Sequence, residues 1–126
     1  KLKDVSYIHS ESYAAVELKH GTISLIDEDV PVIAVATQTD IIPKTISNVV
    51  EVKSRGAKVI LVCTDACARE LKDGVADYVI EIPHTDELLM PITAAVPLQI
   101  LAYYTSINRG IDPDKPKNLA KSVTVE

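Results

Sequence analysis

The sequence predicts an α/β fold, a three-layer α/β/α sandwich around a parallel sheet. Three short runs, residues 30–37, 58–64 and 77–83, are rich in β-branched residues and almost continuously apolar. Continuous apolar runs are typical of strands that are covered on both faces. Helical patterns lie between these runs, and this alternation favours a parallel sheet. A length of 126 residues fits one domain.

The first two full helices are expected over residues 11–20 and 43–55. Ser10 or Ser12 can cap the first one, because a hydroxyl oxygen accepts a hydrogen bond from an unpaired backbone N–H. Gly21 can end it, because glycine adopts the left-handed conformation at little cost.

Two further helices are expected over residues 67–73 and 87–108. Thr85 or Asp86 can cap the longer one, and Gly110 follows it. Residues 1–9 are typical of the end of a helix that is already under way. Together with the absence of an initial Met, this predicts a fragment of a longer protein.

Composition excludes several classes of protein. The formal net charge is −5, and no cluster of Lys and Arg is present that could release counterions from nucleic acid or bind an anionic membrane. We expect a cytoplasmic protein, because neither a signal peptide nor an apolar run of membrane-spanning length is seen. None of the four glycines belongs to a Walker loop or a dinucleotide fingerprint, which argues against nucleotide binding by those motifs.

The two cysteines, Cys63 and Cys67, lie in the segment CTDAC. Their spacing is not C-x-x-C, and no second pair completes a zinc site. We interpret them as two reduced thiols, on a strand and on the turn that follows it, and expect no metal site.

Two segments could carry proton-transfer chemistry. His20 lies in ELKHG at a predicted helix end, which favours the protonated imidazole and would make it a proton donor. The plainer interpretation is a surface histidine near the terminal carbonyls. Asp4 is flanked by Lys1 and Lys3, so its carboxylate stays ionised and can act as a base. A solvated helix face explains the same pattern.

Residues 111–126 are polar, contain two prolines and lack periodicity. Composition therefore predicts a loose tail. An ordered loop placed over a site is the alternative interpretation.

Three segments carry a resemblance to a known family: KLKDVSYIHSESYAAVELKHG, PVIAVATQ and DPDKPKNLAKSVTVE. Together they resemble the C-terminal part of the glutamine:fructose-6-phosphate aminotransferases (isomerising), also called glucosamine-6-phosphate synthases, over residues 1–126. The resemblance implies that residues 1–110 form the second sugar-isomerase (SIS) domain, a flavodoxin-like fold that lacks its first strand here. It implies that residues 111–126 form an active-site tail.

The resemblance also implies a reaction. Enzymes of this family transfer ammonia from glutamine to fructose 6-phosphate and isomerise the imine to glucosamine 6-phosphate, a precursor in amino-sugar synthesis. A glutaminase domain and a first SIS domain are the implied partners in a longer chain, and a homodimer is the implied assembly. No metal or organic cofactor is implied.

Individual residues match the family's motifs. His20 matches the ring-opening histidine, which in the family reaches the neighbouring subunit's active site. Lys121 matches the catalytic lysine of the tail that contacts the open-chain sugar, and Ala120 beside it offers a backbone contact. Asp4 matches the isomerising base, and Lys1 matches a lysine one helical turn before it. The resemblance thus implies an ordered tail over the sugar.

Three positions depart from the family's usual pattern. Asp4 replaces the usual glutamate, and misplacing a base by about 1 Å can cost about a hundredfold in rate. Val16 and Thr22 replace a common glycine and a common proline. The family's phosphate-binding loops belong to the first SIS domain, so we expect residues 1–126 alone to be inactive.

Two other functions stay open at this point. The chain could be a stand-alone SIS module that binds a phosphosugar and regulates a partner, with Thr37 and Thr39 holding the phosphate. It could also be a purely structural dimerisation domain, although such a domain would not explain the polar tail.

Overall fold

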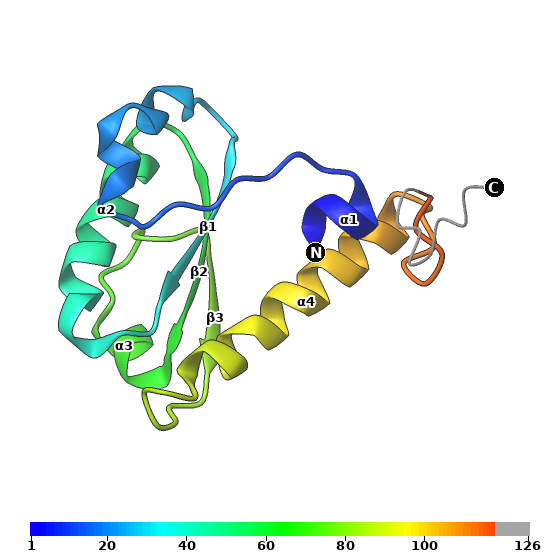
Figure 1. Cartoon of the computed structure of the whole chain (residues 1–126). Coiled ribbons are helices and arrows are strands. Elements are labelled where there is room, and N and C mark those ends of the chain that lie inside the picture. The colour runs from blue at the N-terminus through cyan, green and yellow to red at the C-terminus, as the bar shows by residue number, and fades with distance from the viewer. Residues whose placement is uncertain (118–126) are drawn as a thin grey trace. The chain divides into compact units, whose positions relative to one another are not determined.

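A computed structural model describes residues 1–117 and contains a three-stranded parallel sheet with helices (Figure 1). In chain order the elements are α1 (Leu2–Ser6), the 3₁₀ turns η1 (Glu17–His20) and η2 (Thr22–Leu25), β1 (Pro31–Ala36), η3 (Thr39–Ile41), α2 (Ile42–Ser54), β2 (Lys58–Thr64), α3 (Asp65–Glu70), β3 (Tyr78–Ile82) and α4 (Met90–Asn108). The chain forms two compact units, and the boundary between them falls inside α4. One unit, Ser12–Ala95, contains the sheet; the other joins Lys1–Glu11 to the chain from Val96 onward.

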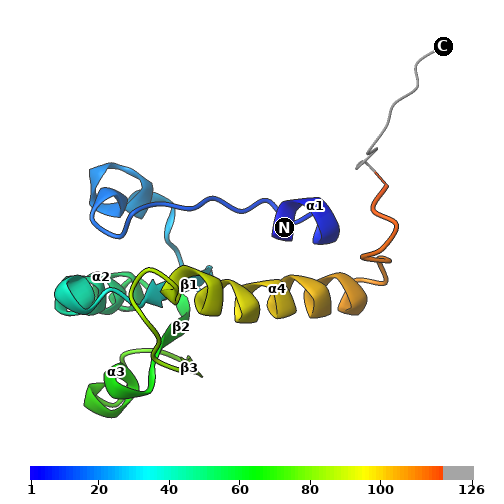
Figure 2. The same cartoon turned by 60° about the horizontal axis from the view of Figure 1, so that its bottom comes forward.

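The sheet has the strand order β1-β2-β3 (Figure 2). Both pairings are parallel. Paired residues in register, such as Val32 with Val59 and Leu61 with Val79, lie on the same face of the sheet. The predicted α/β fold with a parallel sheet is therefore confirmed. All three predicted strands are present, and β2 has the predicted bounds.

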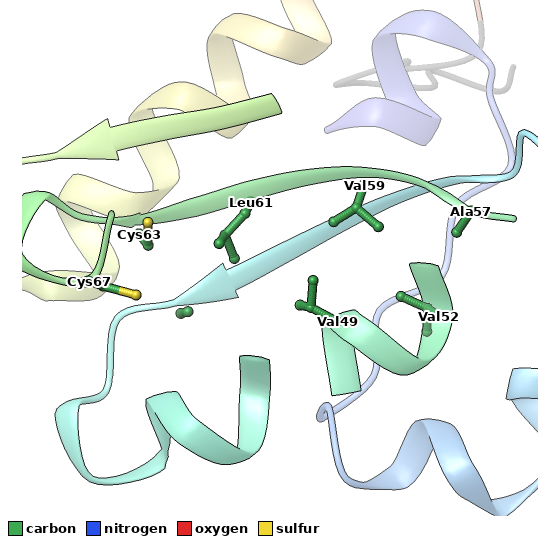
Figure 3. Close-up of a cluster of buried hydrophobic side chains, with 8 residues drawn as sticks. Val49, Val52, Ala57, Val59, Leu61, Cys63 and Cys67 are labelled. Carbon is green, nitrogen blue, oxygen red and sulfur yellow. The ribbon is translucent and has the colours of Figure 1, made fainter. Parts of the chain in front are cut away.

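One face of the sheet and α2 enclose an aliphatic core (Figure 3). Val49 and Val52 of α2 lie in the same cluster as Val59, Leu61 and Cys63 of β2. The three β2 residues are fully buried, and their alternate positions follow from the two-residue period of a strand. With no Phe or Trp in the sequence, β-branched and leucine side chains fill this space.

A cluster of three charged residues, Lys53, Lys58 and Asp77, lies at the amino-terminal end of strands β2 and β3. The Asp77 carboxylate accepts a hydrogen bond from the Val59 backbone N–H at 2.7 Å. It also forms an ion pair with Lys53 Nζ at 2.5 Å. Lys58 Nζ lies 3.9 Å away. The hydrogen bond from Lys53 is the main cause that holds the pKa of Asp77 below its ordinary value of 3.8.

The turn into β2 depends on a glycine. Gly56 has φ +93°, and a Cβ at this position would lie 3.0 Å from the Glu28 Cα. The Gly56 carbonyl also accepts a hydrogen bond of 2.9 Å from the Asp29 N–H. Both the backbone conformation and the close approach therefore require a residue without a side chain.

The prediction of a helix over residues 11–20 is wrong. Residues 11–14 have no regular structure, and only the short η1 turn forms before Gly21. Leu18 is the apolar residue of this stretch that packs against the core, whereas Tyr13 and Val16 are exposed. A helix this short needs a buried apolar face, because propensity alone does not sustain it in water.

The other helices match the predictions with shifted ends. The α3 helix begins at Asp65 because the Thr64 hydroxyl caps it by accepting from the Cys67 N–H at 3.4 Å. Asp86 lies ahead of α4, where its carboxylate accepts from the Leu88 N–H at 2.9 Å. Within residues 1–117, no helix combines the length and the apolar character that crossing a bilayer requires.

Candidate functional site

The short helix α1 carries Asp4 and follows Lys1. Asp4 Oδ2 lies 3.4 Å from the backbone nitrogen of Lys1, the residue that precedes the helix. This contact does not involve the Lys1 Nζ. Because the Asp4 side chain is 48% exposed, its carboxylate remains accessible to a ligand.

The last turns of α4 hold α1 in place, and the two helices lie side by side in both views (Figures 1 and 2). Ser106 Oγ is fully buried and donates to the Val5 carbonyl at 2.7 Å, and it lies 3.1 Å from the Ile111 carbonyl. Inside α1, the buried Ser6 hydroxyl donates to the Leu2 carbonyl at 2.6 Å. The bond from Ser106 to Val5 ties the helix that carries Asp4 to a residue 101 positions further along the chain.

The end of α4 turns sharply at Gly110, which has φ +70°. The Gly110 N–H donates to the Ile107 carbonyl at 2.8 Å, and the Ile111 N–H donates to the Ser106 carbonyl at 3.0 Å. This pair of bonds is a Schellman motif, which satisfies the last carbonyls of the helix. The motif therefore fixes the direction in which the chain leaves α4.

The loop Ile111–Lys117 follows this turn. The Asp112 carboxylate accepts from the Asp114 N–H at 2.9 Å, and the Lys117 N–H donates to the Tyr7 hydroxyl. The first part of the segment 111–126 is thus held by hydrogen bonds, which differs from the loose tail that composition predicts. Ala120 and Lys121, the two predicted site residues of this segment, lie outside the described residues.

His20 lies in the other compact unit, at the end of η1. Leu18, two positions earlier, packs against the core, and Lys19 Nζ forms an ion pair of 2.8 Å with Glu51 Oε2 of α2. The hydrogen bond from Lys19 is the main cause that lowers the pKa of Glu51 from its ordinary value of 4.5. Two adjacent anchors therefore position the segment, and His20 itself is exposed.

The structure bears on one departure from the family's usual pattern, the valine at position 16 in place of a common glycine. Val16 is 55% exposed and has φ −71° and ψ −36°, ordinary right-handed helical values. Neither tight packing nor an unusual backbone conformation requires a glycine at this position. The valine is therefore compatible with the local geometry.

A cavity of about 330 Å³ lies at the carboxyl end of β1, beside the start of α4. Thr37, Thr39, Asp40 and Glu87 are among its lining residues, and no basic residue lines it within the described part of the chain. Two carboxylates without a cation repel a phosphate group. The predicted role of Thr37 and Thr39 in phosphate binding therefore gains no electrostatic support.

Neither cysteine forms a reactive centre. Both thiols are free, as the sequence predicts, and both are buried. Cys63 lies on the predicted strand, whereas Cys67 lies in the helix α3 and not in a turn. Burial raises the pKa of Cys63 to about 12, so this group stays a neutral thiol and a poor nucleophile. Across residues 1–117, no group of three or more His, Cys, Asp or Glu side chains is placed to hold a metal ion.

The structure thus places the backbone nitrogen of Lys1 beside the Asp4 carboxylate at the start of α1, and it places His20 in the other compact unit. Sequence analysis did not single out Tyr7 or Ser106, which join α1 to the far end of the chain. The partners are 101 and 110 positions apart, and neither residue lies in a recognisable motif for such a contact.

Comparison with known proteins gives consistent results. The SIS domain family matches residues 1–109. Among curated proteins, glutamine–fructose-6-phosphate aminotransferases (isomerizing) of Clostridium perfringens and Lactiplantibacillus plantarum are each 54% identical over all 126 residues. The chain spans 21% and 20% of their respective lengths, about one fifth.

Two solved structures are similar. The C-terminal domain of glucosamine-fructose-6-phosphate aminotransferase from Francisella tularensis has a TM-score of 0.82 and 37% identity, over 88% of this chain and 31% of that one. Glucosamine-6-phosphate deaminase from Thermotoga maritima has a TM-score of 0.69 and 28% identity, over 97% of this chain and 34% of that one. The parallel three-stranded sheet, the family match over residues 1–109 and these likenesses agree: the chain belongs to the SIS domain family.

Proposed function

We propose that the chain is the C-terminal isomerase part of a glutamine–fructose-6-phosphate aminotransferase, acting on fructose 6-phosphate to give glucosamine 6-phosphate. The observation that carries this proposal is identity of 54% over the whole chain to relatives of that name. The likeness to the Francisella tularensis C-terminal domain supports it. In this proposal residues 1–110 are the second SIS domain and residues 111–126 are the active-site tail.

Asp4 is the proposed base. Ammonia condenses with the C2 ketone of the open-chain sugar and water leaves, which makes the adjacent C1–H acidic. The Asp4 carboxylate removes a proton from C1 while the imine nitrogen gains one, which gives an enolamine. C2 then gains a proton and the C1 hydroxyl loses one, so the imine becomes an amino aldose without net oxidation. An accessible carboxylate, as on α1, suits this step.

The remaining proposed roles follow the family's motifs. His20 opens the sugar ring and acts in the active site of the neighbouring subunit of a homodimer. Lys121 contacts the open-chain sugar, and the Ala120 backbone adds a further contact. The anchoring of η1 through Leu18 and Lys19 supports the first role, because it fixes the backbone that presents His20.

Other domains complete the proposed enzyme. A glutaminase domain supplies ammonia, and a first SIS domain holds the phosphate of fructose 6-phosphate. The absence of basic residues around the cavity at Thr37 and Thr39, among the described residues, supports a phosphate site elsewhere. We place the protein in the cytoplasm, because its two free thiols are stable in a reducing compartment.

A pair of hybrid enzymes tests the proposal. Residues 1–126 replace the matching C-terminal segment of the Clostridium perfringens relative in one hybrid and of the Lactiplantibacillus plantarum relative in the other. We expect both to form glucosamine 6-phosphate from glutamine and fructose 6-phosphate, at rates below those of the parents because Asp4 is shorter than glutamate.

Two controls make the result decisive. Glutaminase activity of each hybrid and a cooperative thermal transition report that the rest of the enzyme is folded. Residues 1–126 alone are expected to form no product and to bind fructose 6-phosphate poorly by calorimetry. Two folded hybrids that hydrolyse glutamine but make no amino sugar would contradict the proposal.

A further inference from the structure

We infer that Tyr7 is a positioning residue for the isomerase reaction, an inference that rests on the function proposed above. Its hydroxyl holds the loop Ile111–Lys117 next to α1 and so sets where the chain toward Lys121 begins. The inference concerns the described residues of one compact unit, to which α1, the end of α4 and this loop all belong.

The first observation is the contact itself. The Lys117 backbone N–H donates to the Tyr7 hydroxyl across 110 positions of sequence. Lys117 is exposed, so this N–H could bond to water at little cost if the tyrosine hydroxyl were absent. The bond therefore contributes more to the path of the loop than to the stability of the fold.

The second observation is the backbone of Tyr7. It has φ 55° and ψ 28°, the left-handed conformation at the end of α1. Glycine or asparagine adopts this conformation cheaply, whereas a bulky side chain is an outlier there. A tyrosine held in a strained conformation indicates that its side chain is needed at that point.

The third observation is where the contact lies along the chain. Tyr7 follows Asp4 by three residues, and Lys117 precedes Lys121 by four. Four residues span at most about 14 Å when fully extended. The hydroxyl of Tyr7 therefore forms a short connection between the segments that carry the proposed base and the proposed catalytic lysine.

Ser106 fixes the other end of the same loop. Its buried hydroxyl lies between the Val5 and Ile111 carbonyls, and its own carbonyl accepts from the Ile111 N–H at 3.0 Å. The loop is thus tied to α1 directly at Tyr7 and through Ser106 at Val5. These two attachment points together fix the direction of the loop relative to α1, which a single attachment point would not do.

Loss of the Tyr7 hydroxyl should therefore misplace a reacting group without removing any group that binds the substrate. A misplacement of about 1 Å can cost about a hundredfold in rate. For Tyr7→Phe in the full-length hybrid, we expect kcat to fall about tenfold to a hundredfold, with KM for fructose 6-phosphate within about twofold of the unsubstituted hybrid.

Limited proteolysis provides a second measurement that does not depend on catalysis. Trypsin should cleave after Lys117 faster in Tyr7→Phe, because the loop is released, and after Arg69 at an unchanged rate. Tyr104→Phe is the matched control, because Tyr104 is 59% exposed on α4 in the same unit. We expect this control to keep the kcat and both cleavage rates of the unsubstituted hybrid.

Three results would overturn the inference. In an active hybrid, one is an unchanged kcat in Tyr7→Phe with unchanged cleavage after Lys117. Another is an equal fall of kcat in Tyr104→Phe, and the third is a raised KM at normal kcat, because the hydroxyl would then bind substrate. An inactive but folded unsubstituted hybrid contradicts the proposed function instead, and the cleavage rates still decide whether Tyr7 holds the loop.

Discussion

The segment that carries Asp4 and the segment that carries His20 are held in opposite ways. His20 follows two anchors of its own segment: Leu18 in the core and Lys19 on Glu51. Asp4 lies on a helix of five residues that depends on Ser106, near the far end of the chain. The comparison teaches that His20 is positioned by its immediate neighbours in sequence, whereas Asp4 is positioned by contacts with residues about a hundred positions later in the chain.

Removal of the Asp4 charge gives the largest expected effect. In the hybrid, Asp4→Asn should lower kcat about 10²-fold to 10⁴-fold, the range for loss of a general base, and leave the unfolding midpoint unchanged. Asp4→Glu should raise kcat, because the carboxylate gains the reach of the family's usual residue. Asp114→Asn in the same unit is the control, and an equal loss in that variant would remove Asp4 from its proposed role.

Truncation of the core beneath η1 should have the next largest effect. Leu61 is fully buried in the cluster against which Leu18 packs. Leu61→Ala should lower the free energy of unfolding by about 2–5 kcal/mol, through lost burial and a cavity. Urea unfolding followed by circular dichroism measures this, with Leu25→Ala as the control because Leu25 is 70% exposed. Equal losses in the two variants would contradict the described core.

Removal of the Ser106 hydroxyl tests whether α1, which carries Asp4, is held by a residue far along the chain. Ser106→Ala leaves the Val5 carbonyl without its partner and should cost about 1–3 kcal/mol, the penalty for an unsatisfied buried polar group. Hydrogen exchange should become faster at the amides of α1 and stay unchanged in β2. Ser54→Ala, an exposed serine of α2, should be nearly neutral. Unchanged protection of α1 would show that Ser106 does not hold it.

Removal of the Glu51 charge gives the smallest effect, and it depends on pH. The pKa of Glu51 is lowered in the folded state, so its contribution to stability is present above its ordinary value of 4.5 and is lost as pH falls through the lower folded value. The difference in stability between the unsubstituted chain and Glu51→Gln should be larger near pH 7 than near pH 3. Glu17→Gln on η1 is the control, and a difference that grows on acidification would reject the pairing with Lys19.

The sheet could be predicted from the sequence because its signal is local. Continuous β-branched runs gave β1, β2 and β3 to within one residue, and the 13-residue α2 was predicted with a shift of one position. The helix over residues 11–20 could not be excluded from sequence, because its pattern is helical. Only the structure shows that Tyr13 and Val16, two of its apolar residues, are exposed.

The candidate site was less predictable than the fold. ELKHG and Asp4 could be identified from the residues and the family resemblance, but the contacts that hold them could not. The contact of Ser106 with Val5 and the contact of Tyr7 with Lys117 join positions more than a hundred residues apart, and serine and tyrosine are common in surface helices and loops. Such contacts are set by how the chain folds back, which local pattern does not encode.

The glycine at position 56 has a consequence for how this sequence can vary. Random mutagenesis with selection for folded protein should accept no alternative there, because every other residue would bring a Cβ against the Glu28 backbone. Gly74 and Gly110 also have positive φ, but a Cβ would meet nothing within 4 Å at either, so asparagine should survive selection at both. The library would then separate a glycine kept for space from glycines kept for conformation alone.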